Sequence, residues 1–155
     1  RTGDLVHRME IGGAKIRNVD EWGIPEADLV YERVRALYRH VMQQDAKIDL
    51  SWANIYRKGD YLSPHSHDIS QAAVVYMLDP GEPRTKKQPF SGSLVFTDPR
   101  IEACCPKQAD CVNREVGVEM KPGTMMMFPA ALVHFVHPYM GERPRITIAF
   151  NISPV

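Results

Sequence analysis

The stretch from Glu115 to Ser153, EVGVEMKPGTMMMFPAALVHFVHPYMGERPRITIAFNIS, decides the fold class. Pro-Gly, Phe-Pro and Gly-Glu divide it, and residues of this kind interrupt extended structure. The segments between them are short and rich in β-branched and aromatic residues, so they predict four short strands. Strands that follow one another this closely are typical of a sandwich or jelly roll, and not of parallel βαβ units.

The preceding part of the chain predicts one helix and further strands. Apolar residues at helical spacing predict an amphipathic helix over about residues 25–44, and Pro25 suits its first turn. Further strands are expected within 50–60, 71–83 and 92–100, each closed by turn residues. The apolar residues that define the helix are Leu29, Val30, Val34, Leu37, Tyr38 and Val41.

Composition restricts the possible partners. Apolar residues make up 44% and charged residues 25% of the 155 residues, as in an ordinary globular domain. Lys plus Arg and Asp plus Glu both total 19, so no basic excess favours nucleic acid or a membrane surface. No window reaches the ~18 consecutive apolar residues of a membrane span. We expect a cytoplasmic protein; no signal peptide is visible, although a chain that starts at Arg1 leaves a trimmed leader open.

All three cysteines lie in one polar segment. Cys104, Cys105 and Cys111 are an odd number, which argues against a secreted disulfide framework. A zinc site would need a fourth ligand, and none is adjacent. We expect surface thiols on a loop, and a Cys105–Cys111 disulfide remains the alternative.

Two histidines stand at the entrance to an apolar run, in YLSPHSHDIS. On a strand His65 and His67 face the same way and Asp68 faces the other way. Two imidazoles on one face can bind one metal ion, and LVHFVHP supplies a third from His134 or His137, which face opposite ways on a strand. Packed, hydrogen-bonded histidines without a metal are the alternative.

The last strand combines an apolar face with a polar one. In RPRITIAFN, Arg145 and Thr147 share one face and the isoleucines share the other. A guanidinium directed into a barrel is costly without an anion, and a carboxylate matches its planar fork. A metal beside Arg145 would suit a ligand that chelates the metal at one end and pairs with Arg145 at the other. Arg143 is the reserve anion partner.

Three segments together resemble the 2-oxoglutarate and Fe(II)-dependent oxygenases: YRKGDYLSPHSHD, SGSLVFTDPR and PGTMMMFPAALVHFVHPYMGERPRITIAFNIS. The resemblance covers roughly residues 50–153 and is strongest to small stand-alone members. It implies a mainly β fold with an N-terminal helix, built as a double-stranded β-helix (a jelly roll, or cupin-like barrel). We therefore expect a single domain over 1–155, with an arm and support helix over 1–49 and the oxygenase core over 50–155.

The family pattern is H-x-D/E, a distant His, and an Arg about ten residues later that is followed at the second position by Ser or Thr. The resemblance implies iron(II) as the metal and 2-oxoglutarate as the cosubstrate. The cosubstrate's far carboxylate would pair with Arg145 and Thr147, and Tyr56 would line its pocket unless it is a core tyrosine with a satisfied hydroxyl. The positions that match the pattern are His65, His134, Arg145 and Thr147.

The acid position of the pattern holds His67, and this departure leaves the second ligand open. Either His67 binds the metal, giving the set His65, His67 and His134, or Asp68 reaches it through a bulge. Strand parity favours His67. Three imidazoles would make the site one charge more positive and would also suit zinc, copper or nickel.

Three functions are compatible with these residues. An oxygenase of this family would oxidise a C–H bond of a small molecule or peptide and release succinate and carbon dioxide; a homodimer is compatible with it. A cupin-type dioxygenase or isomerase would share the barrel and the histidines without using 2-oxoglutarate. A jelly-roll binding module would need no metal. The pair Arg145 and Thr147 directly after the distal histidine favours the oxygenase.

Overall fold

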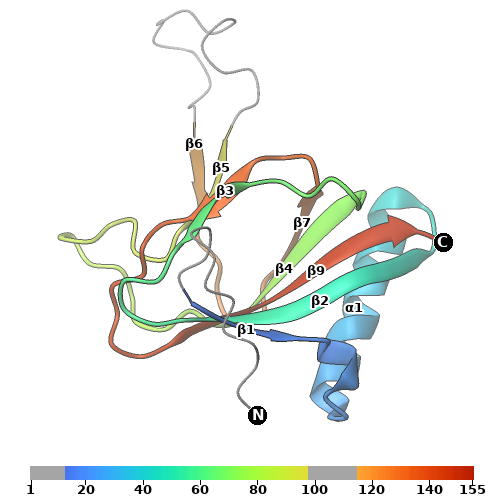
Figure 1. Ribbon diagram of the computed structural model, residues 1–155, viewed down its shortest axis with the longest axis horizontal. Coiled ribbons are helices and arrows are strands. Elements are labelled where there is room, and N and C mark those ends of the chain that lie inside the picture. Colours follow the sequence, from blue (N-terminus) through green and yellow to red (C-terminus); the bar gives the residue numbers. More distant parts are fainter. Residues whose placement is uncertain (1–12, 98–114) are drawn as a thin grey trace, which may run out of the picture.

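Two antiparallel sheets form the body of the protein in the computed structural model, which describes residues 13–97 and 115–155 (Figure 1). The jelly-roll architecture is confirmed, and the four strands expected between Glu115 and Ser153 are present. That the whole chain is one domain stays a prediction.

The major sheet has the order β1 (Ala14–Arg17), β2 (Ala46–Tyr56), β9 (Arg145–Pro154), β4 (Ala72–Asp79) and β7 (Met125–Pro129). The minor sheet has the order β3 (Leu62–His65), β8 (His134–Val136), β5 (Leu94–Thr97) and β6 (Glu115–Val118).

The expected helix is present as α1, Pro25–Met42. Ile24 is extended, as a residue before proline prefers, and Pro25 occupies the first turn, where no intrahelical donor is lost. The helix ends two residues earlier than predicted because Gln43 adopts a left-handed conformation at φ 56°. From there its N–H donates to Arg39 O at 2.9 Å, which closes the last turn.

α1 covers the outer face of the major sheet (Figure 1). Val34 and Tyr38 are fully buried against Ile148, Phe150 and other outward-facing residues of β4 and β9. Burial of an aliphatic side chain of this size stabilises a fold by about 1.5–3 kcal/mol. The short η1 helix, Val19–Glu21, joins the same apolar cluster through its valine. The helix therefore supports the sheet from outside and leaves its other face to the interior between the sheets.

Strand register places polar residues on the inner face of the major sheet. Tyr56 pairs with Arg145 across β2 and β9, and Asn54 pairs with Thr147. Directly paired residues share a face, so these four side chains face the space between the two sheets. The alternation read from the sequence for Trp52, Asn54 and Tyr56 is therefore confirmed.

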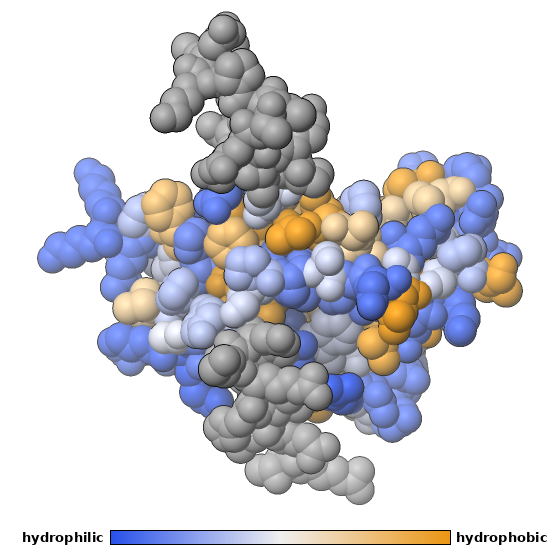
Figure 2. Space-filling model, turned by 45° about the horizontal axis from the view of Figure 1, so that its top comes forward, coloured by the Kyte–Doolittle hydropathy of each residue, from blue (hydrophilic) through white to orange (hydrophobic). Residues whose placement is uncertain are grey.

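The surface is mixed in character. Hydrophilic residues predominate on the face drawn in Figure 2, with hydrophobic residues in a broken band across its upper part. The most exposed large apolar side chains within the described part of the chain include Ile69 and Phe90, which lie in separate loops. The one long helix that the structure describes is not apolar enough to cross a membrane. The three cysteines lie outside the described residues, so what we expect of them stays a prediction.

Candidate metal centre

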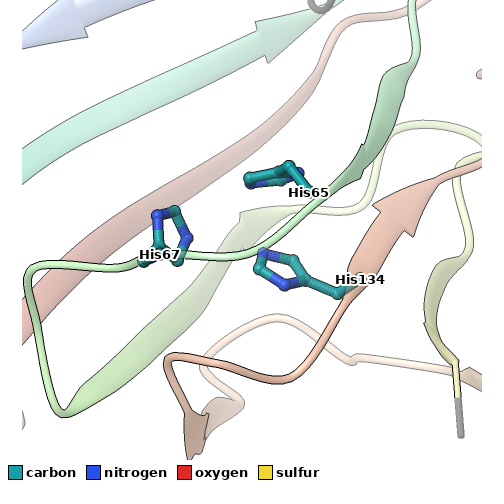
Figure 3. A group of neighbouring side chains, drawn as sticks. All are labelled: His65, His67 and His134. Atoms are coloured by element: carbon teal, nitrogen blue, oxygen red, sulfur yellow. The ribbon is translucent and has the colours of Figure 1, made fainter. Parts of the chain in front are cut away.

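Three imidazoles from two separated segments converge between the sheets (Figure 3). His65 ends β3 and His134 begins β8, and the two residues are direct partners in the strand register. Their ring centres are 4.3 Å apart, and the His67 ring lies 5.0 Å from that of His65 and 5.3 Å from that of His134. One nitrogen from each ring lies within 4.8 Å of the others, which is close enough for all three to bind one metal ion.

Two of the rings have their tautomers fixed by the backbone. Nδ1 of His65 lies 2.9 Å from Ser63 O, and Nδ1 of His134 lies 2.9 Å from Leu132 O. A carbonyl oxygen only accepts hydrogen bonds, so each Nδ1 carries the proton and each Nε2 carries the lone pair. This is the arrangement that metal-binding histidines usually show, with the second ring nitrogen donating to a backbone carbonyl.

His67 reaches the cluster differently from the way the sequence predicts. We expected it on the same strand as His65, but β3 ends at His65 and His67 lies in the irregular segment that follows. The backbone N–H of His67 donates to Ala130 O at 2.9 Å, and this hydrogen bond holds the segment against the chain just before β8. Asp68 is exposed and does not belong to the cluster.

The third ring meets a buried amide. The Asn151 side chain is 3% exposed and its amide nitrogen lies 3.3 Å from Nδ1 of His67, while the amide oxygen has no hydrogen-bond partner. Rotating the amide by 180° directs the oxygen at Nδ1. In that orientation the oxygen would accept the Nδ1 proton of His67 and leave the lone pair on Nε2, which is the assignment that matches the other two histidines.

Burial keeps two of the three rings neutral. It lowers the pKa of His134 to about 4, and burial together with the charge of His65 lowers the pKa of His67 to about 4. Both rings are therefore unprotonated at neutral pH. Neutral imidazole is the form that binds metals, so at these two rings no proton has to be displaced before a cation binds.

A buried guanidinium faces the same interior. Arg145 is 4% exposed, and among the described residues no carboxylate lies within ion-pairing distance of it. Burial lowers its pKa to about 10, so the guanidinium stays charged at neutral pH. Its charge lies over the Tyr56 ring, 5.6 Å from the ring centre. A buried charge without an anion is costly, so Arg145 suits an anionic ligand.

Neighbouring residues shape the space around Arg145. Gly92, at φ 61°, approaches so closely that a Cβ there would lie 2.9 Å from Arg145 Cδ. The Tyr56 hydroxyl is buried without a hydrogen-bond partner, and burial raises its pKa to about 12, so it remains a donor. The Thr147 hydroxyl, 3.4 Å from the Asn54 amide nitrogen, faces the same side. Tyr56 is therefore not the core tyrosine with a satisfied hydroxyl that the sequence left open.

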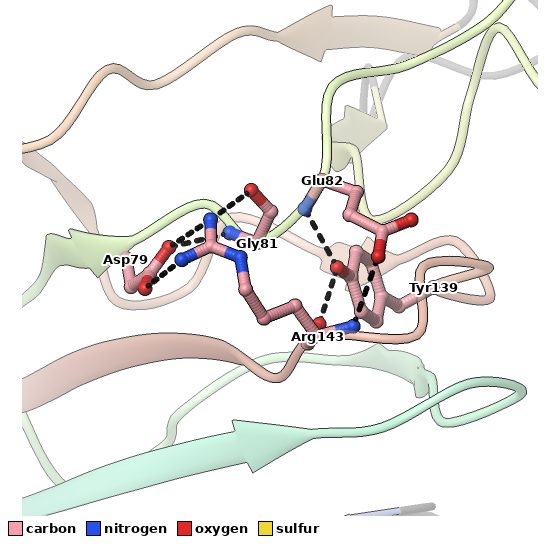
Figure 4. A network of polar contacts seen from close by, with 5 residues as sticks. All are labelled: Asp79, Gly81, Glu82, Tyr139 and Arg143. Atoms are coloured by element: carbon pink, nitrogen blue, oxygen red, sulfur yellow. Dashed lines mark hydrogen bonds and ion pairs between the residues drawn. The ribbon is translucent and has the colours of Figure 1, made fainter.

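Arg143, the reserve anion partner, belongs to a different network (Figure 4). Its guanidinium pairs with Asp79 at 3.2 Å and donates to Gly81 O at 2.7 Å. The buried Tyr139 hydroxyl donates to Arg143 O at 2.5 Å and accepts from Glu82 N at 2.8 Å. Arg143 therefore fixes the loops at this end of the barrel and already has its anion.

The imidazoles and Arg145 line a cavity with two adjoining parts, which share several wall residues. Its inner part is narrow and is lined by Tyr56, Arg145 and Thr147 among apolar residues such as Phe128 and Val136. An outer cavity of about 470 Å³ opens beside it. The residues that line both parts are Lys15, Trp52, Leu62, His65, His67 and Asn151.

The structure thus brings six sequence-predicted site residues to one cavity, whereas His137 lies near Phe90 and Phe135 instead. Asn151 and Lys15 also line this cavity and were not predicted from the sequence. Asn151 has the same parity as Arg145 and Thr147, and that signal could have identified it. Lys15 lies on the four-residue edge strand β1, where the sequence carries no clear alternation. The six residues are His65, His67, His134, Tyr56, Arg145 and Thr147.

Similar structures share this architecture. A prolyl-4-hydroxylase from Pseudomonas putida is 20% identical, with 96% of this chain and 76% of that chain covered at a TM-score of 0.62. A viral collagen prolyl hydroxylase from Paramecium Bursaria Chlorella virus-1, solved with 2-oxoglutarate, is 14% identical, with 94% and 81% covered at a TM-score of 0.64. An oxygenase from Burkholderia pseudomallei is 13% identical; the match covers 84% of this chain but only 58% of that one, at a TM-score of 0.59. At these identities the likeness establishes the fold.

Family membership rests on the sequence itself. No curated protein matches the chain significantly. The family model described as "Putative 2OG-Fe(II) oxygenase" matches residues 50–151, which include the three clustered histidines and the buried arginine. The chain therefore belongs to the 2OG-Fe(II) oxygenases, enzymes that use iron(II) and 2-oxoglutarate.

Proposed function

We propose that the protein hydroxylates a C–H bond of a small molecule or peptide. In this reaction substrate, 2-oxoglutarate and dioxygen give hydroxylated substrate, succinate and carbon dioxide, which balances all atoms. His65, His67 and His134 hold the iron, and Arg145 and Thr147 hold the cosubstrate. The observation that carries the proposal is that a three-imidazole cluster and a buried arginine line one cavity, and that no described carboxylate pairs with this arginine.

The residues fit an iron ion. Iron(II) is bound readily by imidazole nitrogen, and three ligands on one side leave open positions for small molecules. His65 and His134 carry their lone pairs on Nε2 because their Nδ1 atoms donate to backbone carbonyls. When bound, iron(II) supplies the redox chemistry that activates dioxygen, which no amino-acid side chain provides. The protein's part is to position the three rings and to keep those of His67 and His134 neutral.

The residues also fit 2-oxoglutarate. Arg145 offers a planar donor fork that matches a carboxylate, and it has no such partner among the described residues. The Tyr56 hydroxyl is a second buried donor without a partner. A dicarboxylate held here would satisfy both groups, and its other end would face the imidazole cluster.

The surrounding residues exclude water. Leu94, Phe128 and Val136 line the inner part of the cavity and are nearly fully buried. An apolar wall strengthens the pairing of Arg145 with a carboxylate, because charges attract more strongly where water is absent. The wall also keeps bulk water away from the reacting centre.

The test uses metal-free protein loaded with iron(II) under argon. Elemental analysis should give one iron per chain, and a titration should give saturable binding of 2-oxoglutarate. On admission of oxygen, succinate should form only with both iron and 2-oxoglutarate present.

Two results would contradict the proposal. Iron-loaded protein that fails to bind 2-oxoglutarate would favour a cupin-type activity. If the variants His65→Ala and His134→Ala bind as much metal as the unmutated protein, the metal lies elsewhere. The exposed helix residue His40, replaced by Ala, is the matched control for losing one imidazole.

A further inference from the structure

Edge strand β1 contributes two cations to the wall of the outer cavity. Lys15 pairs with Asn54, and Arg17 pairs with Trp52, in the register of β1 and β2. Because directly paired residues share a face, both cations lie on the inner side of the major sheet. Ile16, between them, packs on the other side against the cluster beneath α1.

The Lys15 ammonium group contacts an aromatic ring and pairs with no carboxylate among the described residues. Its ammonium nitrogen lies 4.8 Å from the centre of the Trp52 ring, which is a cation–π contact. Among the described residues no Asp or Glu pairs with it. Burial, with the charge of Arg17, lowers its pKa to about 8. The fold therefore keeps this cation at the cavity at a cost in stability that an anion would reverse.

The described residues that line the cavity include no carboxylate. Neither its outer nor its inner part is lined by any Asp or Glu among the described residues. The outer part, at about 470 Å³, has the size of a small-molecule site. Since Lys15 and Trp52 line both parts, a ligand beside them would lie next to the imidazole cluster.

The net charge of the occupied site also favours an anionic ligand. Iron contributes two positive charges and Arg145 one, whereas 2-oxoglutarate contributes only two negative charges. His67 stands where the family pattern has a carboxylate, so the histidine cluster found among the described residues does not cancel the remaining positive charge. Lys15 and Arg17 add to it. An excess of positive charge in a partly enclosed site is best neutralised by the substrate.

We infer that the outer cavity binds a substrate that carries an anionic group, such as a carboxylate or phosphate, held by Lys15 and Arg17 with its apolar part against Trp52. The inference rests on the proposed function. Lysine on an edge strand can also serve to block strand pairing between molecules. That role needs a charge on the exposed edge, whereas Lys15 faces the cavity and is partly buried.

The test compares matched probes. The protein is loaded with manganese(II) and 2-oxoglutarate under argon, and binding is measured calorimetrically at low salt for 3-phenylpropionate, phenyl phosphate and the neutral 3-phenylpropanamide. Both anions should bind at least about tenfold more tightly than the amide, since hydrogen bonds to charged groups contribute about 1.5–3 kcal/mol. If phenyl phosphate binds more tightly than 3-phenylpropionate, the substrate carries a phosphate. If 3-phenylpropionate binds more tightly, the substrate is a carboxylic acid.

The variants separate this site from the cosubstrate site. Lys15→Met keeps the length of the side chain and should abolish the preference for anions, whereas Lys15→Arg should retain it. Equal binding of all three probes, no binding of any, or a preference that survives Lys15→Met would overturn the inference. Loss of 2-oxoglutarate binding in the unmutated protein would instead overturn the proposed function, so the two failures are distinguishable.

Discussion

The guanidinium of Arg145 lies 5.6 Å from the centre of the Tyr56 ring, and the two residues are direct partners across β9 and β2. The ring face stabilises the charge from one side without using any of its N–H donors. Among the described residues, packing orients the fork, with Gly92 against its stem. A pre-positioned cation of this kind loses little entropy when an anion binds.

Replacing Arg145 by Met should weaken 2-oxoglutarate binding by roughly 10- to 150-fold, the equivalent of 1.5–3 kcal/mol for hydrogen bonds to a charged group. Arg145→Lys keeps the charge but loses the planar fork, so it should give an intermediate loss. Calorimetric titration of manganese-loaded protein measures both. Metal content should be unchanged, and a variant that binds 2-oxoglutarate normally would mean that its carboxylate lies elsewhere.

Histidine substitutions distinguish the two candidates for the second ligand. His67→Ala should lower iron affinity strongly, as should His134→Ala, because each removes a nitrogen of the cluster. Asp68→Ala should leave affinity unchanged, since Asp68 is exposed and outside the cluster. Competition with a chelator of known affinity measures the difference. The opposite ranking of the His67 and Asp68 variants would assign the ligand to the carboxylate.

Asn151 positions His67, so substitutions there should affect metal affinity rather than cosubstrate binding. Loss of a residue that orients a metal-binding histidine typically costs 10–100-fold in affinity. Asn151→Leu should fall in this range, and Asn151→Asp, which still accepts the Nδ1 proton, should lose less. Cobalt(II) absorption provides a readout that does not depend on turnover. An unaltered cobalt spectrum and affinity in Asn151→Leu would contradict the role.

The metal-free protein should lose stability as pH falls from about 6.5 to about 4. The pKa values of His67 and His134 in the folded chain are lowered to about 4 from the ordinary value of 6.5. Across this window the unfolded chain binds more protons, so the free energy of unfolding decreases as pH falls. Urea unfolding at several pH values measures it. The His134→Leu variant should show a weaker dependence, and an unchanged one would assign the effect to other groups.

Tyr139→Phe should destabilise the loops around Arg143. It removes a donor to Arg143 O and an acceptor for Glu82 N, leaving both backbone groups without these partners. A lost hydrogen bond of this kind costs about 1–3 kcal/mol. Urea unfolding measures the change, and Tyr61→Phe, on an exposed side chain, is the control. A loss equal to that of the control would mean that the network adds nothing to stability.

The sequence by itself determined the elements and the faces of the strands. Alternation put Arg145 and Thr147 on one side of β9, and helical spacing identified α1 to within two residues of its end. Both signals are local, because a strand repeats every two residues and a helix every 3.6. The family was indicated by the resemblance of three segments, which include His65, His134 and Arg145.

Only the tertiary structure decided which side chains meet. His67 joins the cluster from beyond the end of its strand, and Asn151 and Lys15 reach the cavity through the pairing of β9 and β1 with β2. Arg143 has the same sequence parity as Arg145, yet it lies in the loop before β9 and pairs with Asp79 at the end of β4. Local periodicity fixes a direction along one strand, whereas distances between segments depend on register and loop contacts, which are set when the whole chain packs.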